Sequence, residues 1–187
     1  MAQFFLAGLS MIWVVGLIGL GIAGAASAYF FIDHVQSRVD RFLNPESGDT
    51  FQITTALDGF RNGGLLGQGP GEGLYKLRLP DAHADFVFAV AGEEFGTIAC
   101  ILIVSLFAFI VLRGFARVLR EQNLFILLAS AGLLTQFGLQ SLVNMASSLH
   151  LMPTKGMTLP FISYGGSSVL ALAIGMGMVL ALTRRRG

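Results

Sequence analysis

The stretch LPDAHADFVFAVAGEEFG, residues 79–96, runs from a charged segment directly into a long apolar one. It carries five ionisable side chains across that boundary: Asp81, His83, Asp85, Glu93 and Glu94. A carboxylate near the bilayer centre costs about 3 kcal/mol to insert, so such residues usually line a cavity, pair with a partner or mark a substrate path. The alternative is a span that begins later, with both glutamates in water. A span over 86–112 is favoured because it needs positions on both sides of Glu93 to reach the roughly 20 residues required.

The composition predicts a membrane protein, since 54% of the residues are hydrophobic and only 12% are charged. A soluble domain carries about 25% charged residues. Four apolar segments predict an all-α, polytopic protein with four transmembrane helices, at about 4–31, 86–112, 124–149 and 159–182. The first segment lacks a basic region before it and exceeds the ~15 apolar residues of a signal peptide, so we expect it to remain as a span.

Charge predicts the orientation, because Lys and Arg in short loops stay on the cytoplasmic side. Three arginines lie between the second and third spans and three near the end of the chain: Arg113, Arg117, Arg120, Arg184, Arg185 and Arg186. Both termini are therefore expected to be cytoplasmic, with the large loop 33–85 and the short connection containing Lys155 outside. The net charge of +1 argues against nucleic-acid binding. Cys100 is the only cysteine, which excludes an intrachain disulfide.

The outer loop has two parts with different composition. Residues 33–51 mix charged and apolar side chains at helical spacing, which predicts either an amphipathic helix at the membrane interface, ending near Asn44 and Pro45, or a solvated linker helix. Residues 59–73 contain seven glycines and one proline, so we expect a loop without regular helix. This segment lacks the spacing of a nucleotide-binding glycine motif.

Polar side chains also occur inside two spans. Gln136, Gln140 and Asn144 recur every four residues, so the three amides form one stripe on a helix, which predicts either interhelical hydrogen bonds or the lining of a polar cavity. Glu93 and Glu94 point about 100° apart, so one is expected to face a cavity and the other a neighbouring helix.

The stretch PTKGMTLPFISYGGSS, residues 153–168, contains two prolines and three glycines, which predict a broken start to the fourth span. Together with residues 79–96, with RVDRFLNP (38–45), with Gln52 and with GGLLGQGPGEG (63–73), it closely resembles the SEDS family of polytopic bacterial membrane proteins. The motifs are closer to the family's division member than to its elongation member. The family has about ten spans, and this chain resembles the carboxyl-terminal four.

The resemblance implies a peptidoglycan glycosyltransferase that polymerises lipid II, the undecaprenyl diphosphate-linked disaccharide peptide, during cell division. It would act at the outer face of the bacterial cytoplasmic membrane, at the septum, beside a class B penicillin-binding protein and other division proteins. Asp85, in the motif His83-Ala84-Asp85-Phe86, is implied to be catalytic. Ala84 stands where the family often has threonine, and Asp81 where it often has glutamate. The alternatives are a lipid II flippase and a noncatalytic scaffold of the division machinery.

The chemistry agrees with this assignment. A sugar hydroxyl must displace a lipid diphosphate, so the site needs a base and positive charge for the leaving group. Asp85 is the candidate base, and burial or the charge of Asp81 would raise its pKa above the usual ~3.9. The candidates for binding substrate are Lys155, Arg78, His83, Ser163 and Tyr164. No cofactor follows from the residues with certainty, but Asp85, alone or with His83, is a candidate ligand for Mg²⁺ or Mn²⁺.

Overall fold

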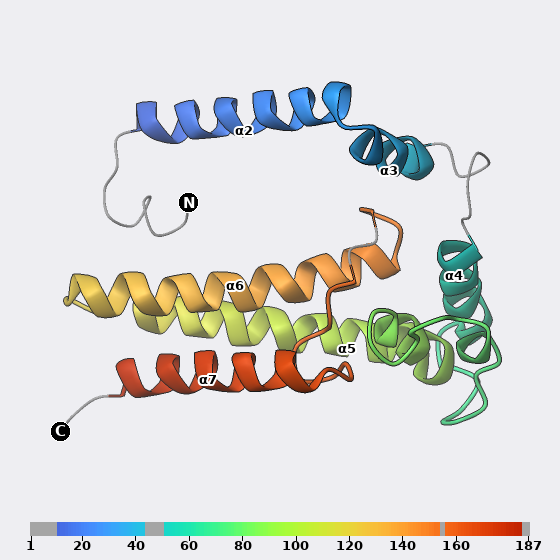
Figure 1. Cartoon of the computed structure of the whole chain (residues 1–187). Coiled ribbons are helices and arrows are strands. Elements are labelled where there is room, and N and C mark those ends of the chain that lie inside the picture. The colour runs from blue at the N-terminus through green and yellow to red at the C-terminus, as the bar shows by residue number, and fades with distance from the viewer. Residues whose placement is uncertain (1–10, 44–50, 154–155, 185–187) are drawn as a thin grey trace. The chain divides into compact units, whose positions relative to one another are not determined.

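The computed structural model of the chain describes residues 11–43, 51–153 and 156–184 (Figure 1). Every regular element in these ranges is a helix, which confirms the predicted all-α fold. The chain divides into two compact units, Met1–Thr50 and Phe51–Gly187.

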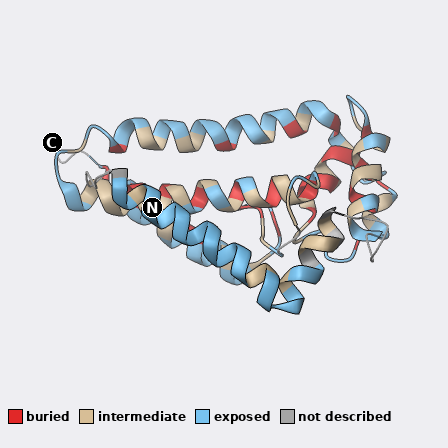
Figure 2. Ribbon diagram, turned by 90° about the horizontal axis from the view of Figure 1, so that it is seen from above, coloured by how far each residue is buried: buried red, intermediate tan, exposed pale blue. Residues whose placement is uncertain are grey.

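The first unit contains α2 (Met11–Phe31) and α3 (Asp33–Leu43). The apolar stretch of α2 has no buried residue, and Figure 2 shows this helix exposed along nearly its whole length. The hydroxyl of Tyr29 donates to Oδ1 of Asp40 at 3.0 Å and ties α2 to α3. The helix predicted from residue 33 onward is confirmed up to residue 43, whereas 4–10 and 44–50 lie outside the described residues. The location of α3 at a membrane interface stays a prediction.

In the second unit, α5 (Val87–Val118), α6 (Leu124–Ser148) and α7 (Gly166–Leu182) run side by side (Figure 1). Three described helices, α2, α5 and α6, are long and apolar enough to cross a membrane, whereas α7, with 17 residues, is shorter. The core between α5, α6 and α7 is mainly aromatic and aliphatic: Phe88, Cys100, Phe107, Phe137, Met145, Leu159 and Leu172. These helices therefore pack on one another through one apolar stripe and leave their other faces exposed.

Two helices have other bounds than the spans predicted for them. Helix α7 begins at Gly166 rather than at 159, because the positive φ of 60° at Phe161 is not that of a right-handed helix. The backbone N–H of Leu159 donates instead to Oγ of Ser163 at 2.7 Å. The prediction of a broken helix start is thereby confirmed. Helix α5 continues beyond 112 to Val118.

Helix α5 is also interrupted, at Gly96, whose φ of 78° and ψ of −179° are not helical. The helix predicted for the second span is thus present, with a break at this glycine. A glycine loop, residues 64–73, inserts at the break. Its Gln68 and Gly69 N–H groups donate to the carbonyls of Glu93 and Glu94, both at 3.0 Å. On the other side of the break, the N–H groups of Thr97 and Ile98 donate to the carbonyls of Gly64 and Leu65, at 2.9 and 3.3 Å. The loop thus satisfies the backbone groups that the break leaves unpaired.

Glycine is required here for close approach rather than for flexibility. A Cβ atom on Gly67 would lie 2.2 Å from the carbonyl oxygen of Glu94, and one on Gly63 would lie 2.0 Å from that of Gly92. Helix α4 (Phe51–Gly63) packs against the start of α5 in this way. The expectation that 59–73 contains no helix is therefore wrong for 59–63, because tertiary packing outweighs the weak helix propensity of glycine.

Candidate active site

Asp85 lies in a tight turn immediately before α5. The N–H groups of Ala84 and Asp85 donate to the carbonyl of Asp81, at 2.9 and 3.0 Å. Leu79, Ala82 and Phe86 are buried, whereas Asp81 and His83 are exposed and Asp85 is partly exposed. The apolar positions of the motif therefore anchor the turn on α4 and α5 and leave its carboxylates at the surface.

The environment of Asp85 favours the protonated carboxyl. Burial raises its pKa above the usual value of 3.8, and the neighbouring charge of Asp81 raises it further. Within the part of the chain that the structure describes, no hydrogen-bond donor contacts this carboxylate. A carboxylate that is partly shielded from water and accepts no hydrogen bond has a higher pKa than one in water, and it is therefore a better proton acceptor.

Asn144 of α6 joins this turn to the segment that precedes α7. Its Nδ2 donates to the backbone carbonyls of Asp85, at 2.9 Å, and Met157, at 2.5 Å. Gly156 has a φ of 61°, and a Cβ placed on it would lie 3.3 Å from Oδ2 of Asp85. The two motifs on which the resemblance rests are therefore adjacent in space. Oδ1 of Asn144 is buried and has no hydrogen-bond partner among the described residues.

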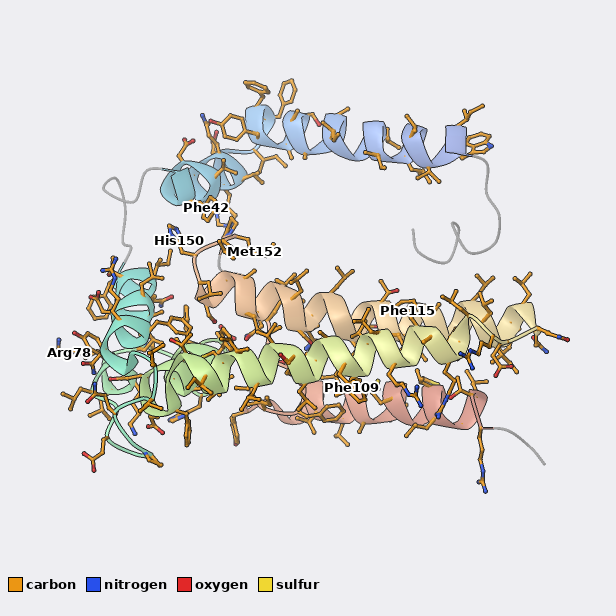
Figure 3. All side chains as sticks on the ribbon, turned by 180° about the vertical axis from the view of Figure 1, so that it is seen from behind. Phe42, Arg78, Phe109, Phe115, His150 and Met152 are labelled. Atoms are coloured by element: carbon orange, nitrogen blue, oxygen red, sulfur yellow. The ribbon has the colours of Figure 1, made fainter. Side chains whose placement is uncertain are left out.

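The predicted substrate-binding residues have different surroundings. Lys155 lies outside the described residues, directly before Gly156 in the chain. Tyr164 is 84% exposed, and its backbone N–H donates to the carbonyl of His83 at 2.9 Å. Both residues therefore lie next to the turn that carries Asp85. Ser163 is buried, and its hydroxyl is used to accept from the N–H of Leu159. Arg78 is exposed and ends the short helix η2 (Tyr75–Leu77); Figure 3 shows it at the outer edge of the unit, beside α4.

The amides of the polar stripe on α6 form hydrogen bonds mainly with the segment before α7. Nε2 of Gln140 donates to the carbonyl of Thr158, at 3.0 Å, and lies 3.3 Å and 3.4 Å from the hydroxyls of Thr158 and Ser168. With Asn144, it fixes the irregular backbone against α6. Gln136 is exposed on the same helix. Within the described residues, only Gln140 reaches another helix, at Ser168 of α7, whereas the bonds of Asn144 go to the segments before α5 and α7.

Glu93 and Glu94 both contact the outer loop. Glu93 is 1% exposed, and its carboxylate accepts from the N–H groups of Leu74, Tyr75 and Lys76, at 2.7, 3.0 and 3.3 Å, and from Nδ2 of Asn62 at 3.3 Å. Glu94 accepts from Nζ of Lys76 at 2.5 Å. These contacts hold the glycine loop and η2 against α5.

Sequence analysis did not single out Asn62 or Lys76. Neither belongs to a recognisable motif, and the only signal was the glycine content of 59–73. In the ranges 11–43, 51–153 and 156–184, no three His, Cys, Asp or Glu side chains lie close enough to form a metal site. A divalent cation at Asp85 stays a prediction.

The chain is similar to proteins of one known family. A family model described as the cell cycle proteins FtsW, RodA and SpoVE matches residues 1–187. A probable peptidoglycan glycosyltransferase FtsW of Caulobacter vibrioides is 50% identical over 185 residues, which cover 99% of this chain and 47% of that protein. The proteins of the same description from Geobacter sulfurreducens and Escherichia coli O6:H1 are 42% and 35% identical and are covered to 47% and 46%. The chain thus spans about half the length of these relatives.

Two solved structures are similar to the chain. One, described as structural coordination of polymerization and crosslinking by a peptidoglycan synthase complex, matches with a TM-score of 0.77 and 29% identity, over 98% of this chain and 52% of that one. The other is an aspartate-to-alanine mutant of the rod shape determining protein RodA of Thermus thermophilus. It matches with a TM-score of 0.50 and 31% identity, over 67% of this chain and 39% of that one.

Proposed function

Because the chain belongs to the family of the cell cycle proteins FtsW, RodA and SpoVE, we propose that it forms the carboxyl-terminal half of a peptidoglycan glycosyltransferase that polymerises lipid II during cell division. The names of the relatives from Caulobacter, Geobacter and Escherichia support the division type. Since the chain covers about half of each relative, the activity belongs to a larger protein or to an assembly of two halves.

One observation carries the proposal: the carboxylate of Asp85, which has a raised pKa and no hydrogen-bond donor among the described residues, lies beside the backbone of Gly156. Residues far apart in sequence make this arrangement, and Asn144 holds them together. A structural carboxylate would be expected to have donors around it. The site therefore has the group that a glycosyl transfer between a sugar hydroxyl and a lipid diphosphate requires.

In the proposed reaction, Asp85 accepts the proton of the acceptor sugar's hydroxyl as the oxygen attacks the anomeric carbon of the donor. The bond between that carbon and the diphosphate oxygen breaks, and the lipid diphosphate leaves with the electron pair. Lys155, next to Gly156 in the chain, is the proposed counter-charge for the diphosphate, with Arg78 or Mg²⁺ or Mn²⁺ as alternatives. The exposed Tyr164 and His83 lie where they can contact the sugars or the peptide.

The proposed partner is a class B penicillin-binding protein, which would crosslink the strands that this protein makes. The similar structure of a peptidoglycan synthase complex supports such an assembly. Other division proteins are further proposed partners.

The protein is a multi-pass membrane protein, and we propose that both termini are cytoplasmic and that Asp85 faces outward. In a Cys100→Ser background, a cysteine replacing the exposed Glu72 should react with an impermeant thiol reagent on intact cells, whereas one replacing the exposed Gln122 should not. Equal labelling, or the reverse pattern, would contradict this orientation.

A flippase would need ionisable groups along a path through the membrane. The two acids within α5, Glu93 and Glu94, are instead held by the outer loop, which favours the polymerase. The test uses the chain co-expressed with the amino-terminal half of the Caulobacter relative, here called the reconstituted protein. In detergent, where no second leaflet exists, it should make glycan strands from lipid II, more so with a class B penicillin-binding protein.

Three controls give the result its meaning. The chain alone should be inactive, because exposed polar groups of α5 and α6 would lack the helices that complete the cavity. Synthesis by the chain alone would show that no second half is needed. Lipid II translocation in vesicles without synthesis would favour the flippase. The scaffold would be favoured if the reconstituted protein makes no strands yet restores division to cells that lack their own protein.

A further inference from the structure

The end of the second unit remote from Asp85 contains a cavity of about 920 Å³. The end of α5, the start of α6 and the end of α7 meet there (Figure 1). Its lining includes four arginines, Arg113, Arg117, Arg120 and Arg184. Arg113 and Arg117 lie one turn apart on α5, Arg120 follows just after the end of α5, and Arg184 follows α7. Two elements far apart in sequence therefore direct positive charge to one place.

Within the described ranges, no acid neutralises this charge. Glu121 is the only acid in the lining, and no ion pair of the four arginines is found among the described residues. All four side chains are exposed. Arginines at a helix end are often explained by membrane orientation alone, but orientation requires only their number, not their convergence on a cavity.

The position of the cavity relative to the membrane limits its ligand. From Gly96 to Val118, α5 rises about 33 Å at 1.5 Å per residue, close to the ~30 Å thickness of the hydrocarbon layer. A membrane crossed by this part of α5 would place the cavity at the surface opposite Asp85, at the depth of lipid headgroups. Its volume falls within the ~300–1,000 Å³ of small-molecule sites, so it has room for more than one phosphate.

We propose that this cavity binds the headgroup of an anionic phospholipid that carries two phosphates. The planar guanidinium group matches a phosphate with two parallel hydrogen bonds, and four such groups suit a pair of phosphates. Basic cavities between transmembrane helices bind such headgroups in other membrane proteins. The site lies on the other membrane face from the proposed catalytic site and does not depend on the glycosyltransferase activity.

The experiment places the reconstituted protein in nanodiscs of phosphatidylcholine that contain a small fraction of cardiolipin, and measures bound lipid by native mass spectrometry. The protein should retain cardiolipin, and phosphatidylglycerol, with one phosphate, at least tenfold less. The double variant Arg113→Gln/Arg184→Gln should lose at least tenfold in cardiolipin affinity. The control, Arg61→Gln, removes an exposed arginine from the opposite end and should bind as the wild type does.

Further measurements distinguish binding of the lipid from binding of a free diphosphate and from non-specific attraction. Inorganic pyrophosphate, which shares the two phosphates, should compete only at millimolar concentration; equal affinity for pyrophosphate and cardiolipin would overturn the assignment to a lipid. Equal loss in the control variant would show that the binding is non-specific attraction and would also overturn it. If Arg113→Gln/Arg184→Gln loses helical circular dichroism, Arg113→Lys/Arg184→Lys replaces it. This variant keeps the charge but not the two-bond geometry, so unchanged cardiolipin binding would contradict the proposed site.

Discussion

Asp85 and Glu93 belong to the same short stretch of sequence and have opposite surroundings. Glu93 is 1% exposed and accepts hydrogen bonds from three backbone N–H groups and one side-chain amide. Asp85 is partly exposed, receives no such bond within the described residues, and has a raised pKa. A carboxylate that accepts several hydrogen bonds from a loop holds that loop in place. A carboxylate that is partly shielded from water and accepts no hydrogen bond is more readily protonated. The two acids therefore differ in how far their hydrogen bonds are satisfied: Glu93 is a structural acid, and Asp85 is the acid to which we assign the chemistry in the proposed function.

The largest expected effect comes from Asp85→Asn in the reconstituted protein. The amide keeps the shape of the carboxylate but cannot accept the proton of the sugar hydroxyl, so polymerisation of lipid II should be abolished. The free energy of unfolding should not fall, because no described donor contacts this carboxylate. The measurement is glycan length from lipid II together with the amount of protein in the membrane. Wild-type synthesis by the variant would remove Asp85 from the mechanism.

The glycine loop tests the other side of the comparison. Gly67 and Gly71 have nearly the same positive φ, 83° and 86°, but a Cβ on Gly67 would lie 2.2 Å from the Glu94 carbonyl, whereas Gly71 has open space. Alanine at either position carries the same conformational strain. Only Gly67→Ala should push the loop off α5 and break the hydrogen bonds at the Gly96 break. With about 1 kcal/mol for each of the four backbone hydrogen bonds at the break, Gly67→Ala should cost about 4 kcal/mol more than Gly71→Ala.

That difference can be measured by unfolding in sodium dodecyl sulfate, followed by circular dichroism. Equal destabilisation by the two substitutions would mean that the loop does not need its close contact with α5. A loss confined to Gly67→Ala would identify the loop as part of the folded framework that supports the site.

Glu93→Gln should have a somewhat smaller effect. The neutral amide oxygen accepts weaker hydrogen bonds than a carboxylate, and its NH₂ would point at N–H donors, so we expect a loss of about 2 kcal/mol in the free energy of unfolding. Glu72→Gln is the matched control, because Glu72 is exposed in the same loop. The folded fraction of Glu93→Gln should still polymerise lipid II. A fully folded but inactive Glu93→Gln protein would break the division between structural and chemical acids.

Sequence patterns predicted the features that depend on local composition and missed those that depend on contacts between distant segments. Apolar length predicted the helices α5 and α6, whereas the catalytic role of Asp85, which the resemblance implies, stays a prediction. The break at Gly96 was missed because hydropathy does not change there. The partners of Glu93 were missed because three of its four bonds come from backbone N–H groups, which leave no trace in side-chain type. The glycine content predicted a loop but not its close packing on α5, which depends on the distant residues Gly92 and Glu94.

The smallest effect that we predict concerns Asp81, whose charge raises the pKa of Asp85 after burial has done so. If Asp85 acts as the base, activity is lost as the pH falls through its pKa. Asp81→Asn removes the repulsion and lowers that pKa, so the acid limb of kcat/KM should move to lower pH while burial keeps the pKa above 3.8. Asparagine tolerates the positive φ of 54° at this position, so the turn should keep its shape. Asp58→Asn, on α4 and paired with Arg61, is the control and should leave the acid limb unchanged. An acid limb that moves to higher pH in Asp81→Asn, or that moves equally in the control, would show that the titrating group is not Asp85.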